Sequence, residues 1–199
     1  YNTAVGTNSG LDLTTGTQAT LIGHGAGANL TDADFNVVVG TNALAADTLG
    51  SKSVAIGTQA LNTQNFTTAT DAHNVGIGYQ AGVSLTTGTK NTMVGSLAGL
   101  SAQACHKNVI VGQACADSLT TGSENVFVGE SCAGSGTITG NDNTAVGRAA
   151  ALNLSSGTNN TTIGHDAGIT GSPGGNITTA NNHICLGDEN VTSANIQVA

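Results

Sequence analysis

The sequence contains the side chains used in nucleophilic catalysis and metal binding, but their spacing fits neither chemistry. Ser, His and Asp are frequent, yet no Gly-x-Ser-x-Gly elbow presents a serine nucleophile. The 5 histidines form no His-x-His pair, and the 4 cysteines form no Cys-x-x-Cys pair of the kind that holds zinc. The acidic pairs Asp32-x-Asp34 and Asp188-Glu189 fall in turns, without the glycine-aspartate nonapeptide of calcium-binding solenoids. We therefore expect no enzyme, no catalytic or metal-binding residue and no cofactor.

The composition points to a thin structure with small side chains. Of the 199 residues only 8% are charged and 3% aromatic, while 29 are Gly and 1 is Pro. The net charge of -8 excludes a basic surface for nucleic acid or for a membrane. No apolar run approaches the roughly 20 residues that span a bilayer. Because the chain begins at Tyr1 and not at Met, we expect a fragment of a longer protein.

A repeat positions every residue of the chain. The unit Asn-x-x-(Val/Ile)-Gly recurs with its glycine at 6, 23, 40, 57, 78, 95, 112, 129, 147, 164 and 187. Most intervals are 17 residues, and three are longer by 4, 1 and 6. A short strand with a glycine corner at this period predicts an all-β fold, a parallel β-solenoid of about eleven 17-residue coils. The array runs from end to end, so residues 1–199 form a single domain.

The strand columns predict a core. Alternate residues of a strand share a face. The residue before each glycine and the residue two places before that one are almost all β-branched (Val, Ile or Thr), which favours a strand. We expect both to point into the coil, with a small corner residue and a Leu filling further inward positions. The predicted structural core is Val5, Ile22, Val39, Ile56, Ile77, Val94, Val111, Val128, Val146, Ile163 and Leu186.

The middle residue of each strand should then face outward, yet this column carries no charge. A strand that is apolar on both faces is usually covered on both. The simplest cover is another copy of the chain, packed around a threefold axis; a dimer would also hide the column. The predicted oligomer interface is Leu21, Val38, Met93, Ile110 and Phe127.

Two families resemble the repeat. Ser53-Val54-Ala55-Ile56-Gly57 is similar to the head repeat of trimeric autotransporter adhesins. The strings at 74–82 and 85–95 resemble repeats of phage tail fibres and related appendage proteins, where such an array often precedes a C-terminal chaperone domain. The segment 182–199 is similar to the stretch just before that domain. The resemblance implies a left-handed β-roll in a homotrimeric fibre of a virion or cell surface. It also implies attachment to a host receptor, taken to be a glycan; the alternative is a bacterial surface adhesin or filament subunit.

Two features remain to be placed on this array. Insertions in repeat proteins often gather on a binding face, so we take Asn65, Phe66 and Pro173 as receptor-binding candidates. Cys115 and Cys132 lie one repeat apart in the small-corner column, within reach of a disulfide. Two buried thiols replacing Ala are the other interpretation, and the sequence leaves this pair open.

Overall fold

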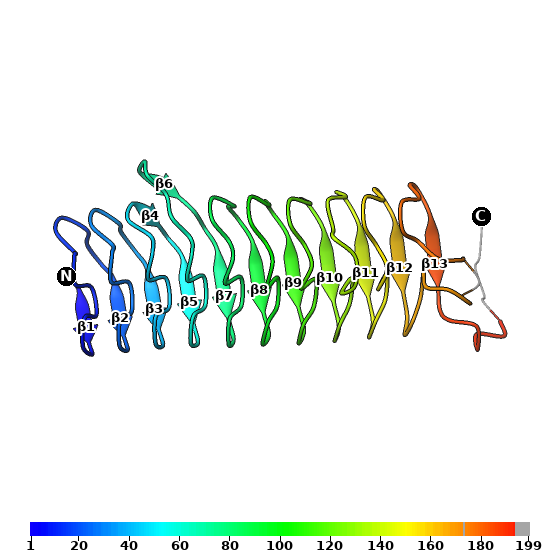
Figure 1. Cartoon of the computed structure of the whole chain (residues 1–199), viewed down its shortest axis with the longest axis horizontal. Coiled ribbons are helices and arrows are strands. Elements are labelled where there is room, and N and C mark those ends of the chain that lie inside the picture. The colour runs from blue at the N-terminus through cyan, green and yellow to red at the C-terminus, as the bar shows by residue number, and fades with distance from the viewer. Residues whose placement is uncertain (173, 194–199) are drawn as a thin grey trace, which may run out of the picture.

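The chain forms a straight rod of stacked coils, with β1 (Thr3–Val5) and β13 (Ile184–Leu186) at its opposite ends (Figure 1). The structure is a computed structural model, and it describes residues 1–172 and 174–193. It is an all-β parallel solenoid of about nine turns with a spacing of about 17 residues. These described residues contain no helix. The predicted all-β parallel solenoid is therefore confirmed.

Eleven three-residue strands pair in parallel as one sheet along the rod, in the order β1-β2-β3-β5-β7-β8-β9-β10-β11-β12-β13. The repeat sets the register, so that Val109 pairs with Thr92 and Val126. The strands are β1 (Thr3–Val5), β2 (Thr20–Ile22), β3 (Val37–Val39), β5 (Val54–Ile56), β7 (Val75–Ile77), β8 (Thr92–Val94), β9 (Val109–Val111), β10 (Val126–Val128), β11 (Thr144–Val146), β12 (Thr161–Ile163) and β13 (Ile184–Leu186).

The glycine after each strand makes the corner. Gly112 has a φ of 140°, which L side chains rarely adopt. A Cβ on Gly112 would also lie 2.3 Å from the carbonyl oxygen of Gly129 in the next coil. The column of repeat glycines therefore exists because backbones stack here without room for a side chain.

The strands face the opposite way from our prediction. The middle residues Leu21, Val38, Met93, Ile110 and Phe127 are 0% exposed inside a single chain. They line the bore of the coil, so their assignment to an oligomer interface is wrong. The predicted core column is also wrong, because its members point outward and are half-buried or exposed: Val5, Ile22, Val39, Ile56, Ile77, Val94, Val111, Val128, Val146, Ile163 and Leu186.

Buried asparagines set this orientation. The Asn before each strand shares a face with the middle residue, because side chains alternate. Asn108 donates from Nδ2 to the carbonyl oxygen of Gly122 and to Oδ1 of Asn91, both at 3.0 Å. Its own Oδ1 accepts from the backbone and side-chain N–H groups of Asn125. A buried amide needs such partners, so the polar residue turns inward and the β-branched residues on either side of the middle residue turn outward.

A ladder of side-chain hydrogen bonds runs through Asn74, Asn91, Asn108, Asn125, Asn143 and Asn160. The small-corner and Leu columns are buried as expected. Their fully buried members are Ala26, Ala43, Ala60, Ala81, Ala98, Cys115, Cys132, Ala150, Ala167, Leu30, Leu85, Leu119 and Leu154.

The middle residues of the strands differ in size from coil to coil, and a second column of residues compensates for the difference. A Cβ on Gly76, the smallest middle residue, would lie 2.7 Å from Cγ of Leu61. The repeat position of Leu61 is taken by Gly82 and Gly99 beside the larger Met93. A Cβ on either glycine would lie within 2.8 Å of the Met93 sulfur. Large and small residues therefore alternate between two columns and keep the bore close-packed.

The four-residue insertion projects from the edge of the rod. It carries β6 (Thr70–Asp71), which pairs in parallel with β4 (Gly50–Ser51) of the preceding coil. Figure 1 shows β6 rising beyond the outline of the other coils. The insertion thus adds a second, two-stranded sheet on one side of the stack.

Candidate interaction surface

Two outward columns form an uncharged strip along the whole sheet, which we call the aliphatic face. It consists of the first and third residue of each strand in the sheet. Neighbours in the same column cover part of each side chain, and Val37, Val109 and Val126 remain 37–38% exposed. The members of the aliphatic face are Thr3, Val5, Thr20, Ile22, Val37, Val39, Val54, Ile56, Val75, Ile77, Thr92, Val94, Val109, Val111, Val126, Val128, Thr144, Val146, Thr161, Ile163, Ile184 and Leu186.

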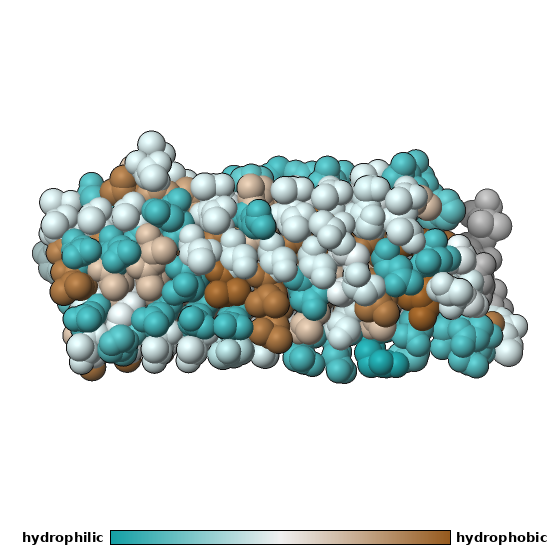
Figure 2. All heavy atoms as spheres, viewed as in Figure 1, coloured by the Kyte–Doolittle hydropathy of each residue, from teal (hydrophilic) through white to brown (hydrophobic). Residues whose placement is uncertain are grey.

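The size of this strip distinguishes it from ordinary surface. Strands about 4.8 Å apart give a length of about 50 Å, and two columns of side chains give an area on the order of 600 Å². On the face of the rod shown in Figure 2, hydrophobic residues gather in small groups separated by polar ones. Small groups of that kind are normal on soluble proteins. The uncharged strip, in which most residues are aliphatic, is as large as the largest apolar patch of a typical monomer, and such patches are often functional.

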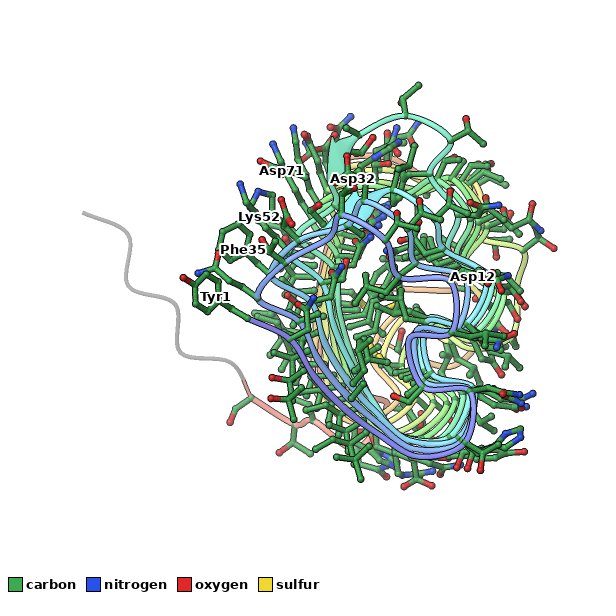
Figure 3. All side chains as sticks on the ribbon, turned by 90° about the vertical axis from the view of Figure 1, so that its left-hand side faces the viewer. Tyr1, Asp12, Asp32, Phe35, Lys52 and Asp71 are labelled. Atoms are coloured by element: carbon green, nitrogen blue, oxygen red, sulfur yellow. The ribbon has the colours of Figure 1, made fainter. Side chains whose placement is uncertain are left out.

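One margin of the aliphatic face is a column of exposed side chains that we call the edge column. It lies two residues before each strand and comprises Tyr1, Gln18, Phe35, Lys52, His73, Lys90, Lys107, Glu124, Asp142, Asn159 and Asn182. Its residues from Gln18 onward have left-handed backbone, with φ between 50° and 62°. Figure 3 shows Tyr1, Phe35 and Lys52 projecting side by side from the same edge of the coils.

The edge column collects most of the cations in the chain. Lys52, Lys90 and Lys107 are three of the 4 Lys and Arg residues, and His73 lies between the first two. Lys52 donates to Asp71 at 2.5 Å, and Lys107 donates to Glu124 at 2.5 Å. These bonds lower the pKa of both carboxyl groups, and Glu124 raises the pKa of Lys107. The cationic run is therefore bounded at both ends by ionised carboxylates.

The opposite margin carries a smaller polar cluster after the corner glycines. Arg148 contacts the ring of His165 and lies 3.9 Å from a carboxylate oxygen of Asp166. Nδ1 of His165 lies 3.5 Å from Asp188. Hydrogen bonds from Asn190, and then from His165, lower the pKa of Asp188. The two long margins of the aliphatic face thus carry different charge patterns.

A buried polar network anchors the projecting insertion. Ser53 replaces Asn in the ladder, and Gln64, which occupies the Leu position of its coil just before the insertion, fills the gap. Its Nε2 donates to Asp47 at 2.6 Å and to Ser53 at 3.2 Å. Asn74 in turn donates to Oε1 of Gln64 at 2.9 Å. Burial raises the pKa of Asp47, although three hydrogen-bond donors, among them the backbone N–H of Phe66, favour its ionised form. Every member of this network has a partner, which fixes the base of the insertion.

The three receptor-binding candidates are not brought together on an exposed site. Phe66 is only 7% exposed and its ring lies over Gly50, so it cannot offer a stacking surface to a sugar. That assignment is wrong, because the bond from the Phe66 backbone to Asp47 holds the residue against the coil. Asn65 is exposed, and its Oδ1 accepts from Thr48 at 3.2 Å. Pro173 lies outside the described residues.

The four cysteines are free thiols in the interior. Sγ of Cys115 donates to the carbonyl oxygen of Phe127 at 3.4 Å, and Sγ of Cys132 donates to that of Ala145 at 3.3 Å. Contact with Cys132, together with burial, raises the pKa of Cys115, and burial raises that of Cys105 to about 11. In this structure the pair therefore occupies its corner column as two small thiols.

Within residues 1–172 and 174–193, the His, Cys, Asp and Glu side chains form no group of three that could hold a metal ion. Over the same part of the chain, no helix has the length and apolar character needed to cross a membrane.

No family model matches this chain, and neither does any curated protein or solved structure.

Proposed function

We propose that the chain is a structural and adhesive segment of a homotrimeric fibre, a phage or virus tail fibre, which presents a binding surface to a host glycan. In this proposal the eleven repeats form eleven coils of a rigid left-handed shaft. The role has no catalytic step and involves neither nucleic acid nor membrane insertion. The location is the virion or another extracellular surface.

The observation that supports this proposal is the aliphatic face. It is uncharged over about 50 Å, and its side chains are half-buried or exposed among the described residues. Its area, on the order of 600 Å² without the margins, is at the lower end of the range that stable interfaces bury per partner. A second copy of the same rod offers a strip of equal length and matching period.

A closed ring of copies covers the face completely. In a parallel threefold arrangement, the first-residue column of one rod packs on the third-residue column of the next. Such a ring leaves no strip open, whereas an open arrangement would continue into a filament. Three coaxial copies also give stiffness and multiply the contacts with a surface.

The second candidate is a bacterial trimeric surface adhesin. It is favoured by the unit Ser53-Val54-Ala55-Ile56-Gly57, in which Val54 and Ile56 belong to the aliphatic face. Both candidates require the same association of rods.

A matched pair of variants tests the association. Val111→Asp places a carboxylate in the middle of the aliphatic face, and Thr121→Asp places one at an exposed position outside it. We expect Val111→Asp to reduce the mass measured by light scattering to that of one chain, while Thr121→Asp leaves it unchanged. An unchanged mass for Val111→Asp would show that another surface holds the copies together.

A further inference from the structure

The edge column concentrates positive charge on an acidic protein. The chain has 12 Asp and Glu residues against 4 Lys and Arg. Lys52, His73, Lys90 and Lys107 nevertheless occupy four consecutive coils at the same repeat position. Like charges in neighbouring positions of adjacent strands repel, so this grouping does not serve the stability of the stack.

Lys90, near the centre of this run, forms no ion pair with any described residue. Lys52 and Lys107, at the two ends, pair with Asp71 and Glu124. In the part of the chain that the structure describes, no carboxylate lies within ion-pair distance of Lys90 or His73. The left-handed backbone turns both side chains into solvent, where each is exposed. The Lys90 ammonium is therefore presented to an external group, with the His73 imidazole beside it on the preceding coil.

Hydrogen-bonding and apolar groups lie beside the run. Thr89 directly precedes Lys90, and His106 directly precedes Lys107; both are half-buried. Oγ1 of Thr89 lies 3.1 Å from Nδ1 of His106. On the coil before Lys52, Phe35 is 49% exposed. Figure 3 shows Phe35 and Lys52 projecting together from the same edge. An aromatic ring, hydroxyl and imidazole groups and a row of cations thus follow one line along the rod.

We propose that the edge column from Phe35 to Lys107 binds an acidic polysaccharide, a chain of sugars that carries carboxylate or sulfate groups. This rests on the glycan-attachment part of the proposed function and names its chemical class. The run from Lys52 to Lys107 spans three coil intervals, about 14 Å, so a short oligosaccharide laid parallel to the rod places its anionic groups opposite the lysines. The sugar hydroxyls reach Thr89 and His106, and the Phe35 ring packs on a sugar face.

The length of the run favours a saccharide over a nucleic acid. Nucleic-acid binding depends on neutralising many phosphates along a continuous basic track. Here Asp71 and Glu124 close the run at both ends, and the whole chain carries a net charge of -8. A short ligand with few charges fits between these carboxylates, whereas a long polyphosphate would pass over them.

The test compares one cation inside the run with one outside it. Lys90→Gln and Arg148→Gln each remove one positive charge, but Arg148 lies on the opposite margin. A sulfated heparin hexasaccharide and a carboxylated oligogalacturonate are titrated against each protein by calorimetry at low salt. We expect saturable binding of at least one of them by the wild type, weakened about tenfold in Lys90→Gln because a charge-assisted hydrogen bond is lost. Arg148→Gln should bind within about twofold of the wild type.

Three results would overturn the assignment. They are no saturable binding of either saccharide, equal weakening by both substitutions, and binding of oligothymidylate that is as tight and as dependent on Lys90. Light scattering on the same samples separates this inference from the proposed assembly. A wild type that is monomeric but binds the saccharide contradicts only the assembly. A Lys90→Gln variant with reduced mass would make the edge column a contact between copies and refute the saccharide site.

Discussion

Truncating Phe127 tests which column fills the bore. Phe127 is the largest fully buried side chain of the chain. Phe127→Ala leaves a cavity between stacked coils that cannot collapse, because the backbone ladders on both sides are fixed. The expected loss in free energy of unfolding is about 3–5 kcal/mol. For a chain of this length, that corresponds to a decrease in Tm of roughly 6–20 °C.

The matched control lies one residue away on the same strand. Val126 is 37% exposed on the aliphatic face, so Val126→Ala should cost at most about 1 kcal/mol in the isolated rod. Both variants are melted by far-UV circular dichroism at two protein concentrations, since an associated face adds a concentration-dependent contribution for Val126. If Phe127→Ala melts like the wild type while Val126→Ala unfolds at low concentration, an inward Phe127 and an outward Val126 are both refuted.

Three further substitutions test the ladder, the corner and the insertion. Asn108→Ala removes one rung of the asparagine ladder and leaves buried donors of Asn125 without acceptors, so urea unfolding should show a loss of about 2–4 kcal/mol; a loss below 1 kcal/mol would contradict the ladder's role. Gly112→Ala forces a methyl group against the backbone of Gly129 at an unfavourable φ, and soluble expression or Tm should fall sharply, whereas wild-type behaviour would exclude this close approach. Burial raises the pKa of Asp47, so the folded state binds a proton at this carboxyl group more readily than the unfolded state does. The contribution of Asp47 to the free energy of unfolding is therefore greatest at low pH, and it is lost as the pH rises through the raised pKa. The wild type should therefore gain stability relative to Asp47→Asn in urea titrations between about pH 6 and about pH 3, and a parallel pair of curves would contradict the burial effect.

The sequence predicts the architecture well because a 17-residue period leaves few alternatives. Equal coils with a glycine corner can only stack in register, and the strands appear at the expected positions. What the period cannot decide is which face of a three-residue strand points inward. The β-branched residues on both sides of the middle residue suggested a core, since such residues are common inside proteins.

Two signals in the sequence favour the orientation that the structure has. The first is Asn108 and its counterparts: an amide that stacks on itself belongs inside, and alternation then carries Ile110 inward and Val111 outward. The second is the compensation between Gly76 and Leu61, which are small and large at positions that meet in the bore. Only packed side chains are expected to compensate for each other in volume.

The candidate sites depended on features that a repeat pattern does not specify. The insertion near residue 65 was recognisable from its length, but the direction of Phe66 follows from a bond between its backbone and buried Asp47. The lysines share one repeat position, which the sequence displays. Their exposure follows from the left-handed backbone of Lys52, Lys90 and Lys107, a conformation that side-chain type alone does not suggest.

The mass of the unmodified protein in solution tests the central claim most directly, namely that copies of this rod cover one another's aliphatic face. Light scattering at micromolar concentration should give three times the 19.4 kDa of one chain. A mass of 19.4 kDa at that concentration, from a sample with the circular dichroism of a β protein, would contradict the claim.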